Sequence, residues 1–416
     1  MKILFVNNSL DQGGIETFMI RIASHVKEGE LSILLFSKVY DIELLKDLKK
    51  NATVYFLDDF IYGSKIIAKF PFLIKVILPF KKSKLIKEVL SEIDHIHAPD
   101  MNSVLFANRI LSYCKKSITY SLGVYHINEY NFTKYKHLYF VKQFINLIKG
   151  LNYSNFLFFN EISRNLYASI YSQSLMKCDP VPIGIELKKY EGNPVGKKSK
   201  RIVSIGRLSE WKTYNYHMIL TLKYLKENGY DFYYDSYGDG VERNNLEKVV
   251  KKLGLENEIK FHPSILYKDF KSKIADSLLF IGAGTALIEA SACGIPALIG
   301  IENLDKDKPF SYGFLHQFEG LSYQEIQLNL PKITIYNHII NLWGLSDKDY
   351  LLECNLAKQR ANDFDISKTI IKFVALAKNS KPPLIKFDYL QLLFIVSLMT
   401  FHKITNQSKD SYFKRL

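Results

Sequence analysis

Cysteine is scarce in this chain: its 416 residues include four cysteines, and no two of them form a recognisable pairing motif. They are Cys114, Cys178, Cys293 and Cys354. This spacing fits neither a disulfide framework nor a zinc finger, and it predicts a reducing compartment. Met1 leads directly into a strand-like run, so we also expect no signal peptide.

Long apolar runs are missing as well. Pro71 and Pro79 interrupt the run at residues 64–90, and the run at 386–403 is short and carries Asp388, so neither is expected to span a membrane. A Gly-x-Gly-x-x-Gly pattern is absent, which argues against a nicotinamide cofactor. Motifs of nucleic-acid-binding proteins are absent too, so the net charge of +14 does not indicate a nucleic-acid partner.

The length predicts two domains, because 416 residues exceed what one hydrophobic core usually organises. We place the first domain at residues 1–187 and the second at 188–375. The polar, glycine-bearing segment 192–201 suits a hinge between them. Residues 376–416 are expected to form a helix and a basic tail that pack on the first domain or on a membrane.

A glycine turn that leads into a helix is the most informative feature present. The apolar run 278–281 predicts a buried strand, and residues 286–293 predict a helix that ends at Gly294. Backbone amides at the start of this helix, beside Gly282 and Gly284, can bind a phosphate. Glu289 follows within the helix, in reach of hydroxyl groups on the same ligand. An ordinary turn with a surface glutamate is the alternative.

Further strand-and-turn units surround this feature. A strand at 201–206 is followed by Arg207 and Lys212, two cations suited to a diphosphate. Strands at 231–237 and 259–262 follow, each before a helical pattern. Alternating strands and helices predict an α/β fold, with a parallel sheet that binds ligands at the carboxyl ends of its strands.

In order and spacing, these motifs resemble the retaining GT-B glycosyltransferases of family four. The matching pieces are Gly206-Arg207-x-x-x-x-Lys212, Gly238-x-Gly240, and the Glu289 helix with its Gly-x-Pro end. The resemblance implies two Rossmann-like domains with parallel sheets that face each other across a cleft. It also implies a C-terminal helix that returns to the first domain.

The resemblance also implies roles for individual residues. Arg207 and Lys212 would hold the donor diphosphate and act in catalysis, and Glu289 would hold the ribose. The other donor-binding positions are Gly13, Gly14, Gly206, Gly238, Gly240, Gly282, Ala283, Gly284, Thr285 and His262. The family usually has an earlier glutamate eight positions before Glu289, where this chain has Ile281. This difference leaves open whether a carboxylate contacts the donor sugar.

Several histidines in the first domain are candidates. His126 follows the strand-like run 117–122, where the family often places a histidine near the donor sugar, so we assign it to the catalytic set. A hydrogen-bonded structural histidine is the alternative. His95, His97 and Asp100 could suggest a metal site, but a second cluster of ligands is missing. We therefore expect no metal and no cofactor, because Arg207, Lys212 and backbone amides can stabilise the leaving phosphate.

Lysines and apolar residues alternate in the segment Lys65–Lys87. The lysines are Lys65, Lys69, Lys75, Lys81, Lys82, Lys84 and Lys87. Such a segment suits an anionic membrane surface, where each lysine contributes about 1 kcal/mol. Core packing with solvated lysines is the alternative.

Taken together, the motifs and the family resemblance imply a retaining glycosyltransferase, of the hexosyltransferase class, that uses a UDP- or GDP-linked sugar. We expect a lipid-linked or other glycan acceptor in bacterial surface polysaccharide synthesis, such as capsule, O-antigen or lipopolysaccharide. The expected location is the cytoplasmic side of the plasma membrane, as a peripheral protein. A sugar-nucleotide 2-epimerase of the same fold and a non-catalytic polysaccharide-assembly protein remain the alternatives.

Overall fold

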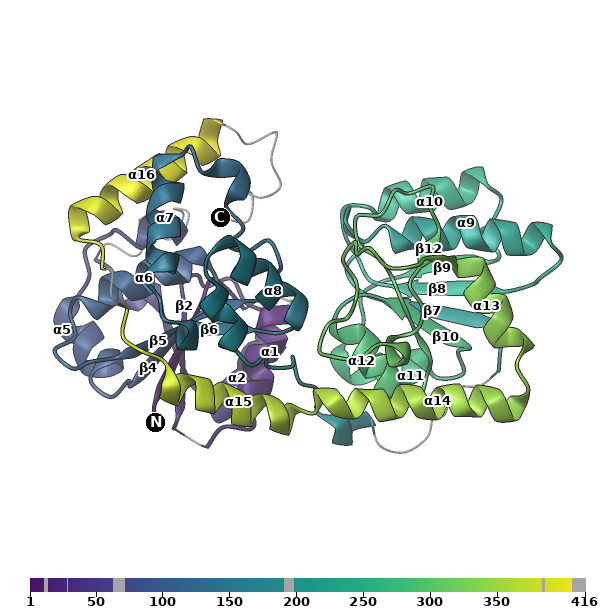
Figure 1. Cartoon of the computed structure of the whole chain (residues 1–416), viewed down its shortest axis with the longest axis horizontal. Coiled ribbons are helices and arrows are strands. Elements are labelled where there is room, and N and C mark those ends of the chain that lie inside the picture. The colour runs from purple at the N-terminus through teal and green to yellow at the C-terminus, as the bar shows by residue number, and fades with distance from the viewer. Residues whose placement is uncertain (11–13, 28, 63–71, 191–197, 384–385, 406–416) are drawn as a thin grey trace. The chain divides into compact units, whose positions relative to one another are not determined.

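The computed structural model describes residues 1–10, 14–27, 29–62, 72–190, 198–383 and 386–405. The chain forms two compact units (Figure 1): unit 1 comprises Met1–Pro182 and Ser367–Leu416, and unit 2 comprises Ile183–Ile366. The sequence-based limits were placed after residues 187 and 375. Gly13, Lys65 and Lys69 lie outside the described residues.

Unit 1 is built on a parallel sheet of six strands in the order β3-β2-β1-β4-β5-β6. Its strands are β1 (Ile3–Asn7), β2 (Leu31–Leu35), β3 (Thr53–Phe56), β4 (His95–Ala98), β5 (Thr119–Val124) and β6 (Phe156–Phe158). β1 and β4 are buried along their whole length, as in sheets that helices cover on both faces. The strand order reverses between β1 and β4.

Helices connect and cover these strands. They are α1 (Gly14–Ala23), α2 (Ile42–Asn51), α4 (Phe72–Lys75), α5 (Lys82–Leu85), α6 (Met101–Leu111), α7 (Tyr139–Lys149) and α8 (Glu161–Ile170). Their starts follow local capping chemistry. The Asp41 side chain accepts from the Glu43 N–H at the start of α2, and Asp100 accepts from the Ser103 N–H at the start of α6.

The C-terminal helices belong to unit 1, which confirms the predicted return of the chain to the first domain. These helices are α15 (Ile366–Asn379) and α16 (Tyr389–Thr405). The Thr369 hydroxyl donates to the Pro182 carbonyl oxygen at 2.9 Å, and the Phe387 N–H donates to Asn108 Oδ1 at 2.7 Å. α16 packs against α4, α6 and α7.

The described part of the segment Lys65–Lys87 differs from the predicted membrane-facing surface. Val76 and Phe80 are buried in the core of unit 1, and Lys75 is buried in an ion pair with Asp58 at 2.7 Å. Val76 and Phe80 therefore stabilise the unit itself, in the region that α16 covers. Lys82, Lys84 and Lys87 remain exposed.

Unit 2 holds a parallel sheet of five strands in the order β11-β10-β7-β8-β9. They are β7 (Arg201–Ile205), β8 (Tyr233–Tyr237), β9 (Ile259–His262), β10 (Leu279–Gly282) and β11 (Ala297–Ile299). A short antiparallel pair, β12 (Phe310–Ser311) and β13 (Ile333–Thr334), lies outside this sheet. The order of strands reverses between β7 and β10.

The helices of unit 2 cover both faces of its sheet (Figure 1). They are α9 (Tyr214–Glu227), α10 (Arg243–Lys252), α11 (Phe270–Ile274), α12 (Thr285–Ala292), α13 (Ile335–Gly344) and α14 (Asp347–Ala361). With two parallel sheets of Rossmann type, the predicted GT-B fold class is confirmed. None of the helices in the described residues is long and apolar enough to cross a membrane.

Candidate active site

The predicted donor site lies where the strand order of unit 2 reverses. β7 and β10 are neighbours in the sheet, with Phe280 opposite Val203. β7 ends before Gly206, and β10 ends at Gly282, so the loops carrying Arg207 and Gly284 leave the same edge of the sheet. In open α/β sheets, ligands bind at this point, outside the carboxyl ends of the strands.

The Gly-x-Gly turn after β8 lets the backbone of the Arg207 loop pass close by. A Cβ atom on Gly238 would lie 2.0 Å from the Gly206 carbonyl oxygen, and one on Gly240 would lie 2.1 Å from the Leu208 carbonyl oxygen. The Leu208 N–H donates to the Asp239 carbonyl oxygen at 2.9 Å, which ties the two loops together. The two glycines therefore position Arg207, and any contact of theirs with a donor stays a prediction.

Arg207 and Lys212 lie near each other at the end of β7. Arg207 is exposed and Lys212 is half-buried, and a Cβ atom on Gly206 would lie 3.1 Å from the Lys212 Nζ. Burial lowers the pKa of Lys212, the positive charge of Arg207 acts in the same direction, and Glu302 and Glu325 oppose it. The loop thus presents a cationic pair at the edge of the sheet where β10 also ends.

The backbone N–H of Gly284, at the start of α12, already binds an anionic group. It donates a hydrogen bond to Oε2 of Glu325, whose carboxylate also interacts electrostatically with Lys212. Gly284 has φ +71°, a conformation that favours glycine. Burial raises the pKa of Glu325, while Lys212 and the Gly284 N–H act to lower it. The amide predicted to meet a donor phosphate therefore holds a carboxylate, beside a predicted phosphate-binding cation.

Glu289 lies on α12 and is almost fully buried, with 4% of its surface exposed. The Tyr267 hydroxyl donates to Glu289 Oε1 at 3.1 Å, and the same hydroxyl lies 2.5 Å from the Tyr190 hydroxyl. A hydroxyl group is thus one of the partners that this carboxylate accepts from. This fits its predicted role toward ribose hydroxyls, which stays a prediction.

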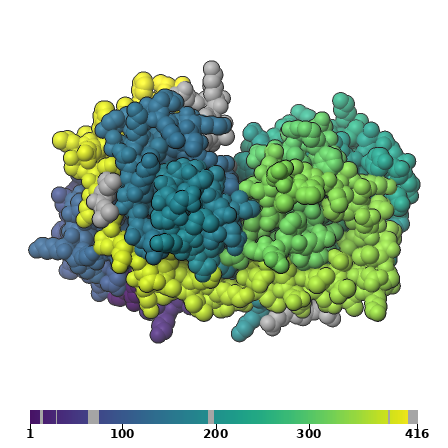
Figure 2. Space-filling model, in the orientation of Figure 1, coloured from purple at the N-terminus to yellow at the C-terminus, as the bar shows by residue number. Residues whose placement is uncertain are grey.

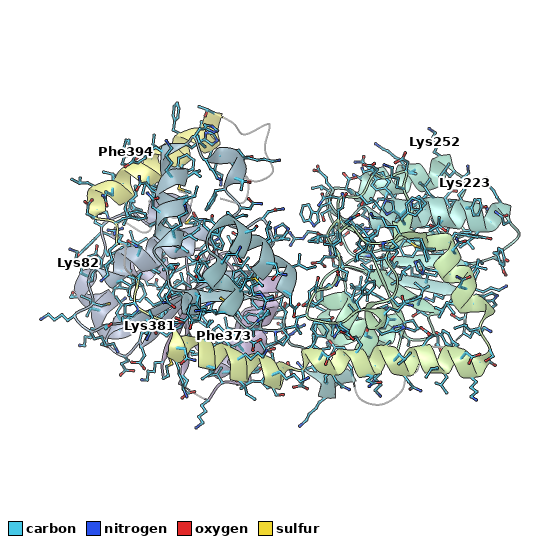
Figure 3. The ribbon with its side chains drawn as sticks, in the orientation of Figure 1. Lys82, Lys223, Lys252, Phe373, Lys381 and Phe394 are labelled. Carbon is cyan, nitrogen blue, oxygen red and sulfur yellow. The ribbon has the colours of Figure 1, made fainter. Side chains whose placement is uncertain are left out.

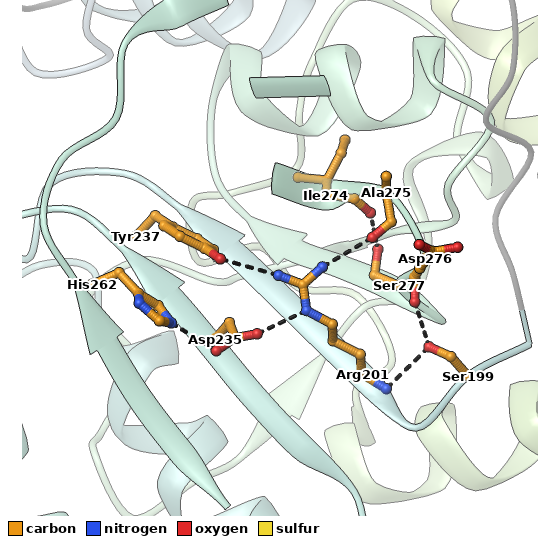
Figure 4. Close-up of polar contacts among 9 residues, drawn as sticks. All are labelled: Ser199, Arg201, Asp235, Tyr237, His262, Ile274, Ala275, Asp276 and Ser277. Atoms are coloured by element: carbon orange, nitrogen blue, oxygen red, sulfur yellow. Dashed lines mark hydrogen bonds and ion pairs between the residues drawn. The ribbon is translucent and has the colours of Figure 1, made fainter. Parts of the chain in front are cut away.

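His262 ends β9 and is held by a network of charged groups (Figure 4). Its Nε2 lies 2.7 Å from Oδ1 of Asp235, and the other oxygen of Asp235 accepts from Arg201 Nε at 2.7 Å. The imidazole stacks on the Tyr237 ring with 4.4 Å between ring centroids. Asp235 therefore fixes the orientation of His262, and a contact between His262 and the donor base stays a prediction.

Other predicted residues lie in unit 1. Gly14 is the first residue of α1, and a Cβ atom there would meet no atom within 4 Å. His126 is half-buried in the turn after β5, where its Nδ1 accepts from the Asn128 N–H at 3.1 Å. This turn fixes the imidazole of His126 through its own backbone. The catalytic role of His126 stays a prediction.

His95 and His97 are fully buried in β4 and form hydrogen bonds with neighbouring hydroxyl groups. Both rings contact the Ser121 hydroxyl at 2.8 Å, and His97 Nε2 also contacts the Tyr125 hydroxyl at 3.0 Å. Asp100, the third member of the alternative metal site, caps α6. Among the described residues, no group of three His, Cys, Asp or Glu side chains is placed to hold a metal ion.

Sequence reasoning missed the carboxylates that face Lys212. Glu302 comes shortly after β11, so its place behind the end of a strand could have been noticed. Glu325 lies in an irregular segment without any motif, and the Glu302 N–H donates to its carbonyl oxygen at 2.6 Å. Only the folded structure brings Glu325 to Gly284.

Part of unit 2 matches a known protein family. Residues 188–301 match the family of glycosyl transferases group 1. A search of curated proteins gives no match.

Similar solved structures cover nearly the whole chain. Anabaena HepE, in complex with UDP and glucose, matches with a TM-score of 0.63 at 18% identity, over 91% of this chain and 100% of that chain. TarM of S. aureus, in a complex that includes UDP, matches with a TM-score of 0.61 at 12% identity, over 91% of this chain and 100% of that one. WaaG, a glycosyltransferase involved in lipopolysaccharide biosynthesis, matches with a TM-score of 0.59 at 12% identity, over 91% of this chain and 100% of that chain.

At these identities the structures establish the fold, and the family match identifies the domain that carries Arg207 and Lys212. Residues 188–301 therefore match the glycosyl transferases group 1 family, and the chain has the GT-B fold of these structures.

Proposed function

We propose that this protein transfers a sugar from a nucleoside diphosphate to an acceptor hydroxyl, with retention of the anomeric configuration. The observation that carries the proposal is the anion-binding arrangement at the strand reversal of unit 2. There the Gly284 N–H and Lys212 already share one carboxylate, that of Glu325. A donor diphosphate would take the same partners, because it offers negatively charged oxygens to the same amide and the same ammonium group.

The arrangement can assist the chemical step electrostatically. When the bond between the anomeric carbon and the leaving oxygen breaks, negative charge grows on the diphosphate. Arg207, Lys212 and the Gly284 N–H would stabilise that charge, and the close-packed glycine turn holds the backbone on both sides of Arg207. Retention rests on the resemblance to the family-four enzymes. On this proposal the leaving group is stabilised without a metal ion.

UDP is the nucleotide that we propose first. Two structurally similar proteins, HepE and TarM, were solved with UDP bound. Glu289 would bind the ribose hydroxyls in place of the Tyr267 hydroxyl. Loops near His262 would then face the base. GDP is the second choice, and a direct comparison of the two nucleotides decides between them.

For the acceptor, we propose a lipid-linked glycan of bacterial surface polysaccharide at the inner face of the plasma membrane. Charge supports this choice: unit 2 contains 24 basic and 24 acidic residues, so the whole excess of +14 falls on unit 1. A positive surface favours approach to anionic lipids. Structural similarity to WaaG, which acts in lipopolysaccharide biosynthesis, is consistent with this proposal.

Turnover of UDP-sugars by the purified protein tests the proposed function. We would measure release of UDP in the presence of a membrane extract that supplies acceptors. Lys212→Ala and Arg207→Ala should each lower the rate at least tenfold, in line with the loss of a group that stabilises transition-state charge. Lys248→Ala, which removes an exposed lysine from α10 of the same unit, is the control. Equal rates in all four proteins would contradict the proposal.

A further inference from the structure

A cavity of about 400 Å³ lies in unit 1, at the start of α16. Its lining residues come from segments that are far apart in the sequence. These segments are Pro79–Phe80, α5, α6 with the residues that follow it, and the start of α16 with the residues before it. Four of the nine lining residues are aromatic, and two are cations. The aromatic and cationic lining residues are Phe80, Lys82, Arg109, Tyr113, Phe387 and Tyr389.

Arg109 is the unusual member of this cavity. Its side chain lies between two rings, with the guanidinium carbon 3.8 Å from the Phe80 ring centroid and 5.2 Å from that of Tyr389. Only 4% of the residue is exposed, and its Nε is a buried donor without a hydrogen-bond partner. One terminal nitrogen donates to the Val76 carbonyl oxygen. A buried guanidinium with an unpaired donor is costly, so it marks a place where an anion can bind.

The charge of the cavity also favours an anion. Lys82 is exposed at the rim, with its Nζ 4.8 Å from the Tyr113 ring centroid. No carboxylate is among the described residues that line the cavity. Asp388, which lies between two lining residues in the sequence, directs its Oδ1 to the Gln391 N–H at 2.7 Å and caps α16. Two positive charges thus face the cavity without a lining acidic partner.

Beside the cavity, α16 exposes an apolar face. One side of the helix is buried, through Leu392, Ile395, Val396 and Met399. The other side exposes large apolar residues. Their spacings of three, four and seven positions place them on one face of the helix. They are Leu390 (73% exposed), Leu393 (38%), Phe394 (53%), Phe401 (67%) and Ile404 (64%).

The figures show this helix at the edge of its unit. In Figure 2 the yellow atoms of α16 lie at the surface of unit 1. Phe394 is labelled on α16 in Figure 3; its ring is half exposed and lies 5.3 Å, between centroids, from the ring of Tyr139 on α7. Water-exposed apolar side chains in a continuous stripe mark an interaction surface, and beside cations they suit the interface of a membrane.

We propose that this cavity binds the phosphate of an anionic phospholipid headgroup, while the exposed face of α16 enters the apolar layer of the same membrane. Arg109 and Lys82 would contact the phosphate, and Leu390 and Phe394 would contact the acyl chains. Charge complementarity selects a lipid over a protein partner, because the whole net charge of +14 falls on this unit. The inference stands on unit 1 alone and does not depend on sugar transfer.

Binding of the full-length protein to vesicles tests the inference. Vesicles contain phosphatidylcholine alone or with phosphatidylglycerol, and the bound fraction is measured by flotation. Lys82→Glu should weaken binding to the anionic vesicles about tenfold or more, because each lysine near headgroups contributes on the order of 1 kcal/mol and the charge changes by two. Lys248→Glu, an equal charge change on α10 of unit 2, should leave binding unchanged.

A second pair of variants tests the apolar face. The double variant Leu390→Ser and Phe394→Ser should weaken vesicle binding roughly tenfold or more, since two large apolar side chains leave the membrane. Val241→Ser, at a residue 75% exposed in unit 2, is the matched control. Both substitutions replace exposed side chains, so folding should be retained, and melting temperatures check this.

Arg109 is tested by Arg109→Lys, which keeps the charge and removes the planar fork. We expect this variant to bind anionic vesicles more weakly than the wild type while it melts as a folded protein. Inorganic phosphate serves as the soluble probe. Stabilisation by phosphate without vesicle binding would overturn the lipid assignment in favour of a soluble anion. Equal binding to neutral vesicles, or equal effects of Lys82→Glu and Lys248→Glu, would also overturn it.

Discussion

Replacing Glu325 by glutamine should strengthen the binding of a nucleoside diphosphate. In the structure, the Glu325 carboxylate accepts from the Gly284 N–H and interacts with Lys212. A donor phosphate needs the same amide and the same cation, so the carboxylate has to leave before the phosphate can enter. Glutamine has nearly the same shape and no charge. It would hold the amide less strongly and would not repel the phosphate.

The magnitude follows from the hydrogen bond that is lost. Bonds to charged groups contribute about 1.5–3 kcal/mol, whereas neutral bonds contribute about 0.5–1.5 kcal/mol. The competing interaction therefore weakens by about 1–1.5 kcal/mol, which corresponds to roughly tenfold tighter binding of UDP. Calorimetric titration at pH 7 measures this change. Glu319→Gln, at an exposed glutamate of the same unit, is the control and should bind like the wild type.

The pH dependence of binding gives an independent check. Because burial raises the pKa of Glu325 above its ordinary 4.5, protons neutralise the carboxylate earlier as the pH falls. Lys212, Arg207 and Glu302 surround the same site, and Lys212 opposes this rise. The affinity advantage of Glu325→Gln over the wild type should therefore shrink on acidification. Weaker UDP binding by Glu325→Gln at pH 7 would refute the reasoning and make Glu325 a ligand of the donor.

Three further predictions concern the fold and the site. Burial lowers the pKa of His95 to about 3 and that of His97 well below 6.5, so unfolding takes up protons below pH 6.5 and stability falls with acidification. Between pH 7 and pH 5, His95 alone should lower the free energy of unfolding, measured by urea denaturation, by about 2 kcal/mol. His95→Asn should remove this loss, whereas His137→Asn, at an exposed histidine, should not. Gly238→Ala should lower the free energy of unfolding by several kcal/mol, on the order of the larger known effects of single substitutions. The reason is that the new Cβ would lie 2.0 Å from the Gly206 carbonyl oxygen. An unchanged melting temperature would disprove this close approach. Glu289→Gln should weaken UDP binding about tenfold without affecting that of inorganic diphosphate, and equal losses for both ligands would contradict a ribose contact.

Local patterns in the sequence predicted much of the fold. In unit 2, the strands that precede the glycine turns and the start of α12 follow from apolar runs and glycine positions, because these depend on neighbours in the chain. The motif around Arg207 and Lys212 pointed to the domain that matches the glycosyl transferases group 1 family. Such signals are local, so one sequence is enough to find them.

Contacts between residues far apart in the chain could not be predicted from the sequence. Glu325 reaches Gly284 across 41 positions from a segment without regular structure, so no spacing predicts the contact. In the segment at 72–80, the alternation of lysines and apolar residues predicted a surface that faces a membrane. In the structure, Val76 and Phe80 of this segment are core residues. An alternation of lysine and apolar residues is compatible with both environments. Only the packing of α16 over this region distinguishes them.

The most direct measurement is the thermal stability of the purified protein with UDP and GDP, in the absence of magnesium. If the loops after β7 and β10 form a diphosphate site, one nucleotide at ~100 times its dissociation constant should stabilise the wild type by roughly 2.7 kcal/mol. Lys212→Ala should lose this stabilisation, whereas Lys248→Ala should keep it. Stabilisation of Lys212→Ala to the same extent as the wild type would contradict the account, as would the absence of any effect on all three proteins.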